Sequence, residues 1–396
     1  MPIINRIAEF HDDMTAWRRD IHAHPETAFE EERTADVVAA KLAEFGIEID
    51  RGLAKTGVVG TLKNGDGPAI GLRADLDALH LSELNDFDHR STHDGKMHAC
   101  GHDGHTTMLL GAARYLAETK RFQGTVHFIF QPAEENEGGG REMVKEGLFR
   151  KFPMQTVYGM HNWPGMPVGT FAMRPGPMMA AHDCFEIEVT GRGAHGAMPN
   201  LGIDPVVVGS AIVSALQSIV SRTNDPLEAM VISVTQFHAG DTWNVIPETA
   251  VLRGTTRSFT PEVQDTIEPA MRRVIDGVAG TYGATAELRY ERRYPATINS
   301  AAETEIAARA AAAVAGPDKI ERGLNPSMGA EDFSFLLQEK PGCYIWIGNG
   351  PGEGGCTLHN PHYDFNDEVL PIGASYWATL VELVLGGGEA AEKLYK

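Results

Sequence analysis

Histidine, cysteine and acidic residues gather in one short segment of the chain. Residues 97–105 read MHACGHDGH and hold three histidines, one cysteine and one aspartate. Thiolate and imidazole are ligands of borderline-soft metals such as zinc, and carboxylates extend the choice to manganese. Cys100 and His102 are two residues apart, so both can reach one site from a short loop. The segment predicts a metal site; the alternative is a polar helix start with Asp103 or Gly104 near its N-cap.

Two adjacent glutamates follow a predicted strand. Residues 125–130 read TVHFIF, an apolar run typical of a buried strand, and QPAEENE follows at 131–137. Paired carboxylates at a strand end can divide their roles, because one can bind a metal while the other moves a proton. Glu134 and Glu135 are therefore candidates for these two roles. The alternative is an exposed acidic loop.

Two further loops contribute histidines. GMHNWP at 159–164 carries His161 at the end of a predicted strand, and LHNPHYDFND at 358–367 carries His359. A lone histidine in such a loop is often structural or solvated. Together, however, the four segments supply a cysteine, a glutamate and three histidines, which is too many ligands for one structural zinc and suits a two-metal site.

A fifth group lies in the middle of the chain. GRGAHGAMP at 191–199 exposes His195 between glycines, NVIP begins at Asn244, and GTTR ends at Arg257. A guanidinium can bind a substrate carboxylate through two hydrogen bonds. The alternatives are a solvated loop histidine, a turn asparagine and a surface arginine.

The elements that must position these residues form an α/β pattern. Strands and helices alternate outside residues 183–294, which predicts a mixed sheet flanked by helices. The sequence NGDG at 64–67 between the apolar runs 57–62 and 69–72 predicts a hairpin. Residues 183–294 follow the order β-α-β-β-α-β of a ferredoxin-like unit. We therefore expect a catalytic domain of residues 1–182 and 296–396 with an inserted domain of residues 183–295.

Composition narrows the class of partner. The 396 residues hold 34 Lys+Arg and 54 Asp+Glu, a net charge of −20, which disfavours nucleic acid and anionic membranes as partners. Four cysteines are too few for a disulfide scaffold, and neither a secretory signal nor a membrane span is apparent. The sequence also lacks a Rossmann fingerprint and a P-loop. A cytoplasmic protein acting on a small molecule is the resulting expectation.

The motifs resemble those of the metal-dependent N-acyl-amino-acid amidohydrolases, which include hippurate hydrolase and the indoleacetyl-amino-acid hydrolases. The resemblance spans almost the whole chain and rests on RADLDAL (73–79), MHACGHDGH, QPAEE, GMHNWP, GRGAHGAMP, NVIPETA with GTTR, MGAEDF (328–333) and LHNPHYDFND. It implies a hydrolase that cleaves the amide of N-acyl-L-amino acids. It also implies that the inserted domain mediates homodimer formation and acts as a lid.

The resemblance also implies roles for single residues. Glu134 would be the general base, and two divalent ions (zinc, manganese, nickel or cobalt) would be held by the ligands Cys100, His102, Glu135, His161 and His359, with Cys100 bridging. His195, Asn244 and Arg257 would contact substrate. A dipeptidase or aminopeptidase and a non-catalytic dimeric binding protein are the alternatives. Glu134 favours an enzyme, because a binding protein has no need of a base beside the ligand Glu135.

Overall fold

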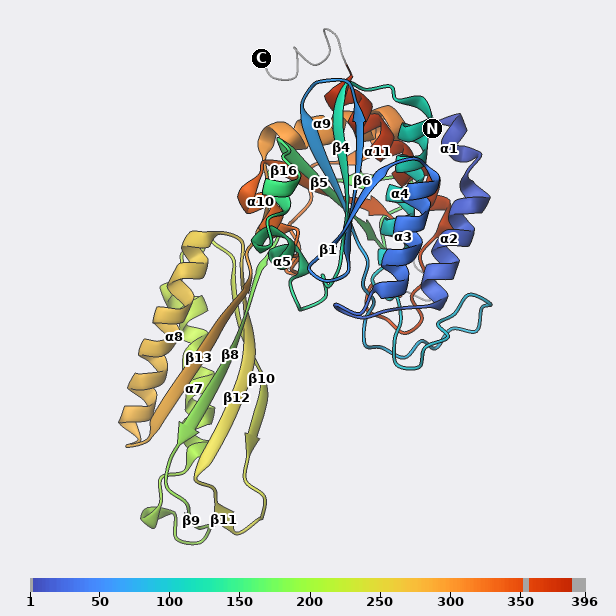
Figure 1. The fold of residues 1–396 in the computed structure, drawn as a ribbon. Coiled ribbons are helices and arrows are strands. Elements are labelled where there is room, and N and C mark those ends of the chain that lie inside the picture. The colour runs from blue at the N-terminus through green and yellow to red at the C-terminus, as the bar shows by residue number, and fades with distance from the viewer. Residues whose placement is uncertain (1–2, 352–355, 387–396) are drawn as a thin grey trace. The chain divides into compact units, whose positions relative to one another are not determined.

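The chain folds into two compact units (Figure 1). A computed structural model describes residues 3–351 and 356–386. The large unit comprises Met1–Met178, Ile298–Asn325 and Asp332–Lys396, and the small unit comprises Met179–Thr297 and Pro326–Glu331. The domain limits expected from the sequence, 1–182 with 296–396 and 183–295, stay a prediction, because a division by contacts does not test which segments fold independently.

The large unit is built on an eight-stranded mixed sheet with the order β1-β2-β4-β3-β5-β16-β6-β15. The strands are β1 (Glu48–Leu53), β2 (Gly57–Asn64), β3 (Ala69–Asp75), β4 (Gly124–Gln131), β5 (Thr156–Trp163), β6 (Phe171–Ala172), β15 (Ile320–Glu321) and β16 (Gly342–Gly348). Strands β4, β3, β5 and β16 pair in parallel, whereas β1–β2, β2–β4 and β16–β6 are antiparallel. The predicted α/β class with a mixed sheet is confirmed.

The predicted hairpin around NGDG is wrong. Strands β2 and β3 do not pair with each other, because β4 lies between them, antiparallel to β2 and parallel to β3. Every residue of β3 is buried, as expected for an interior strand of a parallel sheet with a neighbour on each side. The turn residues predict that the chain reverses direction, but the pairing depends on β4, which comes more than fifty residues later.

Helices cover the large sheet (Figure 1). They are α1 (Asn5–Ala8), α2 (His11–Ala23), α3 (Glu32–Glu44), α4 (His102–Thr119), α5 (Gly139–Lys145), α6 (Leu148–Lys151), α9 (Ala301–Ala315), α10 (Ser334–Glu339) and α11 (Leu370–Leu385). Helix α4 is buried from His102 to Ala113 without interruption, and α11 is buried over most of its length. Since α4 begins at His102, the centre of the core and the predicted metal site share one rigid element.

The small unit has the predicted β-α-β-β-α-β order. Its sheet runs β10-β12-β8-β13. The elements are β8 (Ala181–Thr190), β9 (Ala194–His195), α7 (Pro205–Ser218), β10 (Met230–Ala239), β11 (Val245–Ile246), β12 (Thr249–Ser258), α8 (Pro261–Thr281) and β13 (Thr285–Tyr294). Strand β8 alternates buried and partly exposed residues, so one face of the sheet packs under the helices. The chain passes between the two units within β7 (Gly176–Met179) and β14 (Thr297–Asn299), and again on either side of Pro326–Glu331.

Two helical stretches are long and apolar enough to cross a membrane by length and composition, Pro205–Thr223 and Asp367–Leu385. The second is 78% buried inside the protein, as a core helix is. The first buries one face, through residues such as Val208, Ile212 and Leu216, in the core of the small unit. Packing within the protein accounts for the second stretch and for one face of the first, which is 28% buried. The absence of a membrane span stays a prediction.

Candidate metal centre

Parallel strands bring the chemistry-bearing segments to one edge of the large sheet. Strand β3 ends at Asp75, β4 ends at Gln131 just before the two glutamates, and β5 carries His161 near its end. In an open α/β sheet the carboxyl ends of such strands form the edge where sites are found. Gly101, at the N-cap of α4 with a φ of 91°, lets the chain turn sharply between Cys100 and His102.

The structure brings all five candidate ligands together in two overlapping groups. Cys100, His102 and His161 form the first, and Cys100, Glu135 and His359 form the second; within each group the ligand atoms lie within 4.8 Å of one another. The Cys100 Sγ is 3.3 Å from the His161 Nε2, and the His359 Nε2 is 3.1 Å from the Glu135 Oε1. Because Cys100 belongs to both groups, its sulfur lies within 4.8 Å of the other candidate ligand atoms of each.

Hydrogen bonds orient the two buried histidines. The His161 Nδ1 lies 2.7 Å from the Asn162 carbonyl oxygen and the His102 Nδ1 lies 3.2 Å from the Asp77 Oδ1, so each Nδ1–H donates. Each Nε2 is therefore the ring nitrogen left to face a metal ion, as in metal-binding histidines. The buried His102 Nε2 makes no hydrogen bond to any residue of 3–351 or 356–386. This donor set of one thiol, two oriented imidazoles and nearby carboxylates fits divalent metal ions.

The electrostatics of the cluster also favour bound cations. Burial raises the pKa of the Cys100 thiol, and the negative charges of Glu135 and Glu134 raise it further. For His102, burial lowers the pKa, but the charge of Asp75 and the hydrogen bond to Asp77 outweigh it and raise the pKa to about 10. In both cases neighbouring carboxylates add to the shift, and bound cations would offset their negative charge.

Glu134 lies beside the ligand groups on a conformationally constrained loop. Glu134 is buried, at 7% exposure, and its carboxylate belongs to a third group with His102 and Glu135. The neighbouring residues Ala133 (φ 54°) and Asn136 (φ 70°) adopt left-handed conformations, which cost energy in residues other than glycine. His359 does the same, with a φ of 61°. Strain of this kind gathers at functional sites and persists only where surrounding contacts enforce it.

Two positioning residues were missed by the sequence analysis. Asp77 faces the His102 Nδ1 with one oxygen and accepts a hydrogen bond from the Glu135 backbone N–H (2.9 Å) with the other. Glu31, also buried, accepts from the Ala133 N–H (2.9 Å) and from the Thr56 hydroxyl (2.7 Å). The alternating aspartates of RADLDAL at a strand end could have indicated Asp77, whereas no local pattern marks Glu31.

A buried polar network supports the strand ends behind these groups. Asp75 lies 2.7 Å from the His105 Nδ1 and 2.7 Å from the Arg73 guanidinium, which also lies 2.9 Å from Asp332. Gln131 donates to Asp332 as well. Each member has charged or hydrogen-bonding partners. The network therefore fixes the ends of β3 and β4 relative to the chain around Asp332. Asp75, His102 and His105 form a further group of possible metal ligands.

The small unit brings two of its three predicted residues together. His195 in β9 pairs with Val245 in β11, directly after Asn244, and the Gly196 N–H donates to the Asn244 carbonyl oxygen. The Ala197 N–H donates to the His195 Nδ1, so the exposed ring carries its proton on Nε2. Arg257 lies elsewhere, at the far end of β12 from the β9–β11 tip, and donates to the Thr255 hydroxyl.

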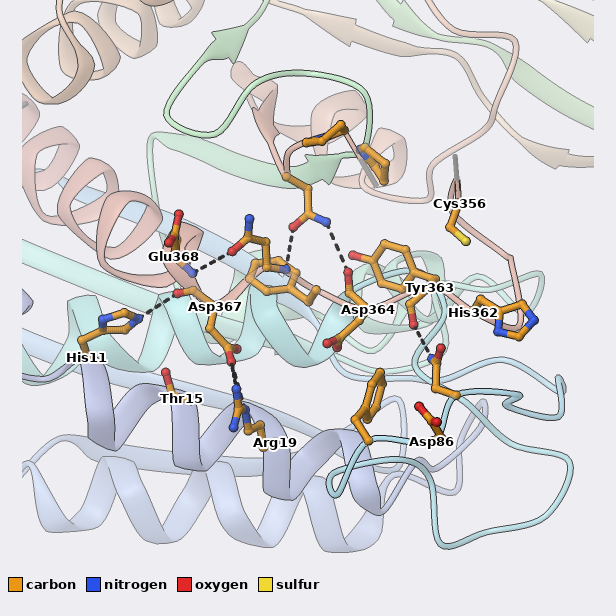
Figure 2. A pocket seen from close by; sticks show the side chains of 17 residues that line it. His11, Thr15, Arg19, Asp86, Cys356, His362, Tyr363, Asp364, Asp367 and Glu368 are labelled. Atoms are coloured by element: carbon orange, nitrogen blue, oxygen red, sulfur yellow. Dashed lines mark hydrogen bonds and ion pairs between the residues drawn. The ribbon is translucent and has the colours of Figure 1, made fainter. Parts of the chain in front are cut away.

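A pocket of about 870 Å³ lies in the large unit outside the two ligand groups (Figure 2). It is formed where α2 faces the segment 362–368. Polar groups around it pair with one another, since Arg19 contacts Asp367 at 2.8 Å and Asn349 donates to the Asp364 carbonyl oxygen. None of the five candidate ligands lines it.

Comparison with known proteins gives matches over the whole chain. An N-acetylcysteine deacetylase of Bacillus subtilis is 40% identical over 380 residues, covering 95% of this chain and 98% of the relative. A hippurate hydrolase of Campylobacter jejuni is 40% identical over 381 residues, covering 96% and 98%. A solved structure described as a dinuclear metal binding peptidase from Bacillus subtilis has 37% identity and a TM-score of 0.83, covering 96% of this chain and 99% of that one.

The family comparison agrees with these matches. Residues 71–383 match the sequence profile described as Peptidase family M20/M25/M40. The matched range includes RADLDAL, both ligand groups and the whole small unit. The resemblance inferred from the motifs and the prediction of a hydrolase are thereby confirmed. The chain belongs to peptidase family M20/M25/M40.

Proposed function

We propose that the protein is a metal-dependent amidohydrolase that cleaves the amide bond of N-acyl-L-amino acids, giving a carboxylic acid and a free amino acid. The observation that carries this proposal is the position of Glu134, a buried carboxylate beside two overlapping groups of metal-ligating side chains. The deacetylase and hippurate hydrolase named above, each 40% identical over nearly the whole chain, support the substrate class.

Two divalent ions, zinc, manganese, nickel or cobalt, would be held by the proposed ligands. These are Cys100, His102, Glu135, His161 and His359, with Cys100 shared between the two groups. Bound ions act as Lewis acids, lower the pKa of water toward neutrality and stabilise negative charge on a carbonyl oxygen. The mixed thiolate, imidazole and carboxylate set is compatible with each of these metals.

Glu134 moves the proton in this mechanism. Its carboxylate accepts a proton from water as the water oxygen bonds to the amide carbonyl carbon. When the carbon–nitrogen bond breaks, Glu134 returns this proton to the leaving amine. The products are the carboxylic acid and the amino acid. Asp77 and Glu31 act as positioning residues, because they hold His102, Glu135 and the Ala133 N–H in place.

His195, Asn244 and Arg257 are the proposed substrate contacts. His195 carries its proton on an exposed Nε2 and can donate to the developing oxyanion, while Arg257 can bind the substrate carboxylate. Arg257 lies eight residues beyond Thr249 along β12, a span of about 26 Å at the usual rise of a strand. A small substrate cannot bridge that distance, so one site would take His195 and Arg257 from two subunits. This supports a homodimer in which the small unit serves as the dimerisation and lid domain.

A dipeptidase or aminopeptidase is the competing function within the family. Such an enzyme must recognise a free α-amine, whereas an N-acyl substrate has none. A non-catalytic binding protein is less well supported, because Glu134 would have no role in it. We further propose that the enzyme acts in the cytoplasm on small molecules, with neither nucleic acid nor membrane as a partner.

The testing experiment is a substrate panel with metal-depleted enzyme reloaded by each of the four metals. The panel comprises N-acetyl, N-benzoyl and indoleacetyl derivatives of several amino acids, each beside a free dipeptide of similar size. Turnover of the acylated amino acids with little turnover of the dipeptides is expected. Faster hydrolysis of the dipeptides would contradict the proposal and favour the peptidase function.

A further inference from the structure

The large unit contains a pocket of about 430 Å³ that the proposed mechanism does not use. One side is formed by Trp163 and Trp346, whose rings stack with centroids 3.8 Å apart and planes inclined by 13°. Its other lining residues are Gly165, Met166, Pro167, Thr170, Ala172, Asp318, Lys319, Ile320, Glu321 and Leu324. We call this the tryptophan pocket. Its volume lies in the range of about 300–1,000 Å³ that is usual for small-molecule sites.

Strand register places the tryptophan pocket on the same sheet face as His161. Paired residues of neighbouring strands point to the same face of a sheet. One row of paired residues crosses the strands β5, β16, β6 and β15, and it reads His161, Trp346, Ala172, Glu321. The His161 ring also contacts Trp163, with centroids 6.3 Å apart. The pocket therefore continues outward from the proposed ligand His161 along one face of the sheet.

The pocket is built into the backbone. The Gly348 N–H donates to the Thr170 carbonyl oxygen (2.9 Å), and the Gly350 N–H donates to that of Met166 (2.8 Å), so the 166–170 wall is tied to the end of β16. A Cβ atom at Gly348 would lie 2.1 Å from the Pro167 carbonyl oxygen, so only glycine allows this approach. Ala172 keeps the floor open, because its side chain is a single methyl group.

The lining selects an aromatic and uncharged occupant. The stacked indoles offer a flat aromatic face. Another ring that packs against this face in an offset or edge-on arrangement gains binding energy. Asp318 and Glu321 outnumber Lys319 among the charged lining residues, which disfavours the substrate's carboxylate. The amino acid half of the substrate therefore fits this pocket poorly, which leaves the acyl half as its occupant.

We infer that the tryptophan pocket binds an aromatic acyl group of the substrate, such as benzoyl, and makes the enzyme prefer arylacyl over acetyl amino acids. This inference rests on the proposed function, since it assigns one half of the proposed substrate. Trp163 and Ala172 are its specificity-determining residues, and neither belongs to the ligand groups.

The test fills the pocket and measures selectivity. In Ala172→Leu, kcat/KM for an N-benzoyl amino acid should fall about tenfold or more, while that for the N-acetyl derivative of the same amino acid should change less than about threefold. Trp163→Ala should act in the same direction, and Trp163→Phe should retain most of the preference because an aromatic face remains. Tyr282→Ala, a half-exposed aromatic in the small unit, is the matched control and should leave the ratio unchanged.

Binding measurements separate this inference from the proposed function. Calorimetry with the Glu134→Ala background compares N-benzoylglycine and N-acetylglycine without turnover, with and without Ala172→Leu. Tighter binding of the benzoyl compound, abolished by Ala172→Leu, supports the pocket even if wild-type enzyme hydrolyses neither compound. The inference would be overturned if Ala172→Leu lowered the affinity for both compounds equally, or if the wild type bound the acetyl compound more tightly. Neither outcome would contradict amide hydrolysis as the proposed function.

Discussion

Glu134 is the residue on which the proposed chemistry depends most directly. Glu134→Ala should lower kcat by about 10²–10⁴-fold, because the proton of the attacking water loses its acceptor. Metal content should stay near that of the wild type, since Glu135, and not Glu134, is the proposed ligand. Steady-state kinetics and elemental analysis measure the two quantities. Glu137→Ala, an exposed acid of the same loop, is the control. Near-normal kcat in Glu134→Ala would remove it from proton transfer.

Cys100 should behave differently from Glu134 because both ligand groups share its sulfur. Cys100→Ser should lose metal and activity together, since a serine hydroxyl stays protonated near neutral pH and bridges poorly. Cys343→Ser, at a buried cysteine that belongs to neither group, controls for the loss of a buried thiol. A Cys100→Ser protein that keeps its full metal content by elemental analysis would place the sulfur outside the ligand set.

Asp77 connects the end of β3 to two of the proposed ligands. Asp77→Asn keeps the shape of the side chain but weakens its acceptance from the His102 Nδ1–H and the Glu135 N–H. Loss of such a supporting carboxylate typically costs about 10–100-fold in metal affinity. Competition with a chelator, followed by metal analysis, measures the change. Unaltered affinity would mean that strand β3 alone orients these groups.

At the scale of elements, helices α2 and α4 meet through a buried ion pair. The His22 Nδ1 lies 2.8 Å from the Asp103 Oδ2, and Arg18 lies 3.6 Å from the same oxygen. Burial lowers the pKa of His22, but the hydrogen bond to Asp103 and its charge outweigh burial and raise the pKa from 6.5 to about 9. The protonated form therefore stabilises the packing of α2 on α4.

The pH dependence of stability follows from this pKa. Because the folded pKa is raised, the contribution of His22 is fully present below about pH 6.5 and is lost as pH rises toward 9; it is on the order of 3 kcal/mol. Urea unfolding of wild type and His22→Gln should give midpoints that differ most at pH 6.5 and converge by pH 9.5. His24→Gln, at the C-cap of α2, is the control. A difference independent of pH would mean that His22 is neutral in the fold.

At the scale of the whole molecule, the small unit should affect turnover without touching the metals. His195→Ala should mainly lower kcat, because its hydrogen bond strengthens as charge develops on the oxyanion. Arg257→Ala should mainly raise KM for substrates with a free carboxylate, since that group is charged in both ground and transition states. Metal content should not change in either variant. If neither kcat nor KM changed in these variants, both residues would have only a structural role.

Subunit mixing tests whether His195 serves the partner's site. His195→Ala and Glu134→Ala are each expected to be nearly inactive. A mixed dimer would regain part of the activity if the intact His195 of one subunit reaches the intact Glu134 of the other. Exchange confirmed by mass spectrometry without any recovery would place His195 in the site of its own subunit.

Much of this protein was determined by local sequence. The apolar periodicity of residues 183–294 sufficed for the β-α-β-β-α-β order. At the start of α8 the Thr260 hydroxyl accepts from the Val263 N–H, a local capping contact. Strand ends could be placed as well, because a buried apolar run such as 125–130 is followed at once by its polar residues. Helix and strand periodicity depend on neighbours a few residues away, so such features are readable without the fold.

Tertiary structure alone decided which elements are neighbours. Three features join segments that are far apart in the chain. Strand β4 lies between β2 and β3, Asp77 forms two hydrogen bonds at the site, and Glu31 accepts a hydrogen bond from the Ala133 N–H. The same is true of the row from His161 to Glu321 that defines the tryptophan pocket. Such contacts are selected by burial and strand pairing summed over the whole core, and no local window of sequence contains that sum.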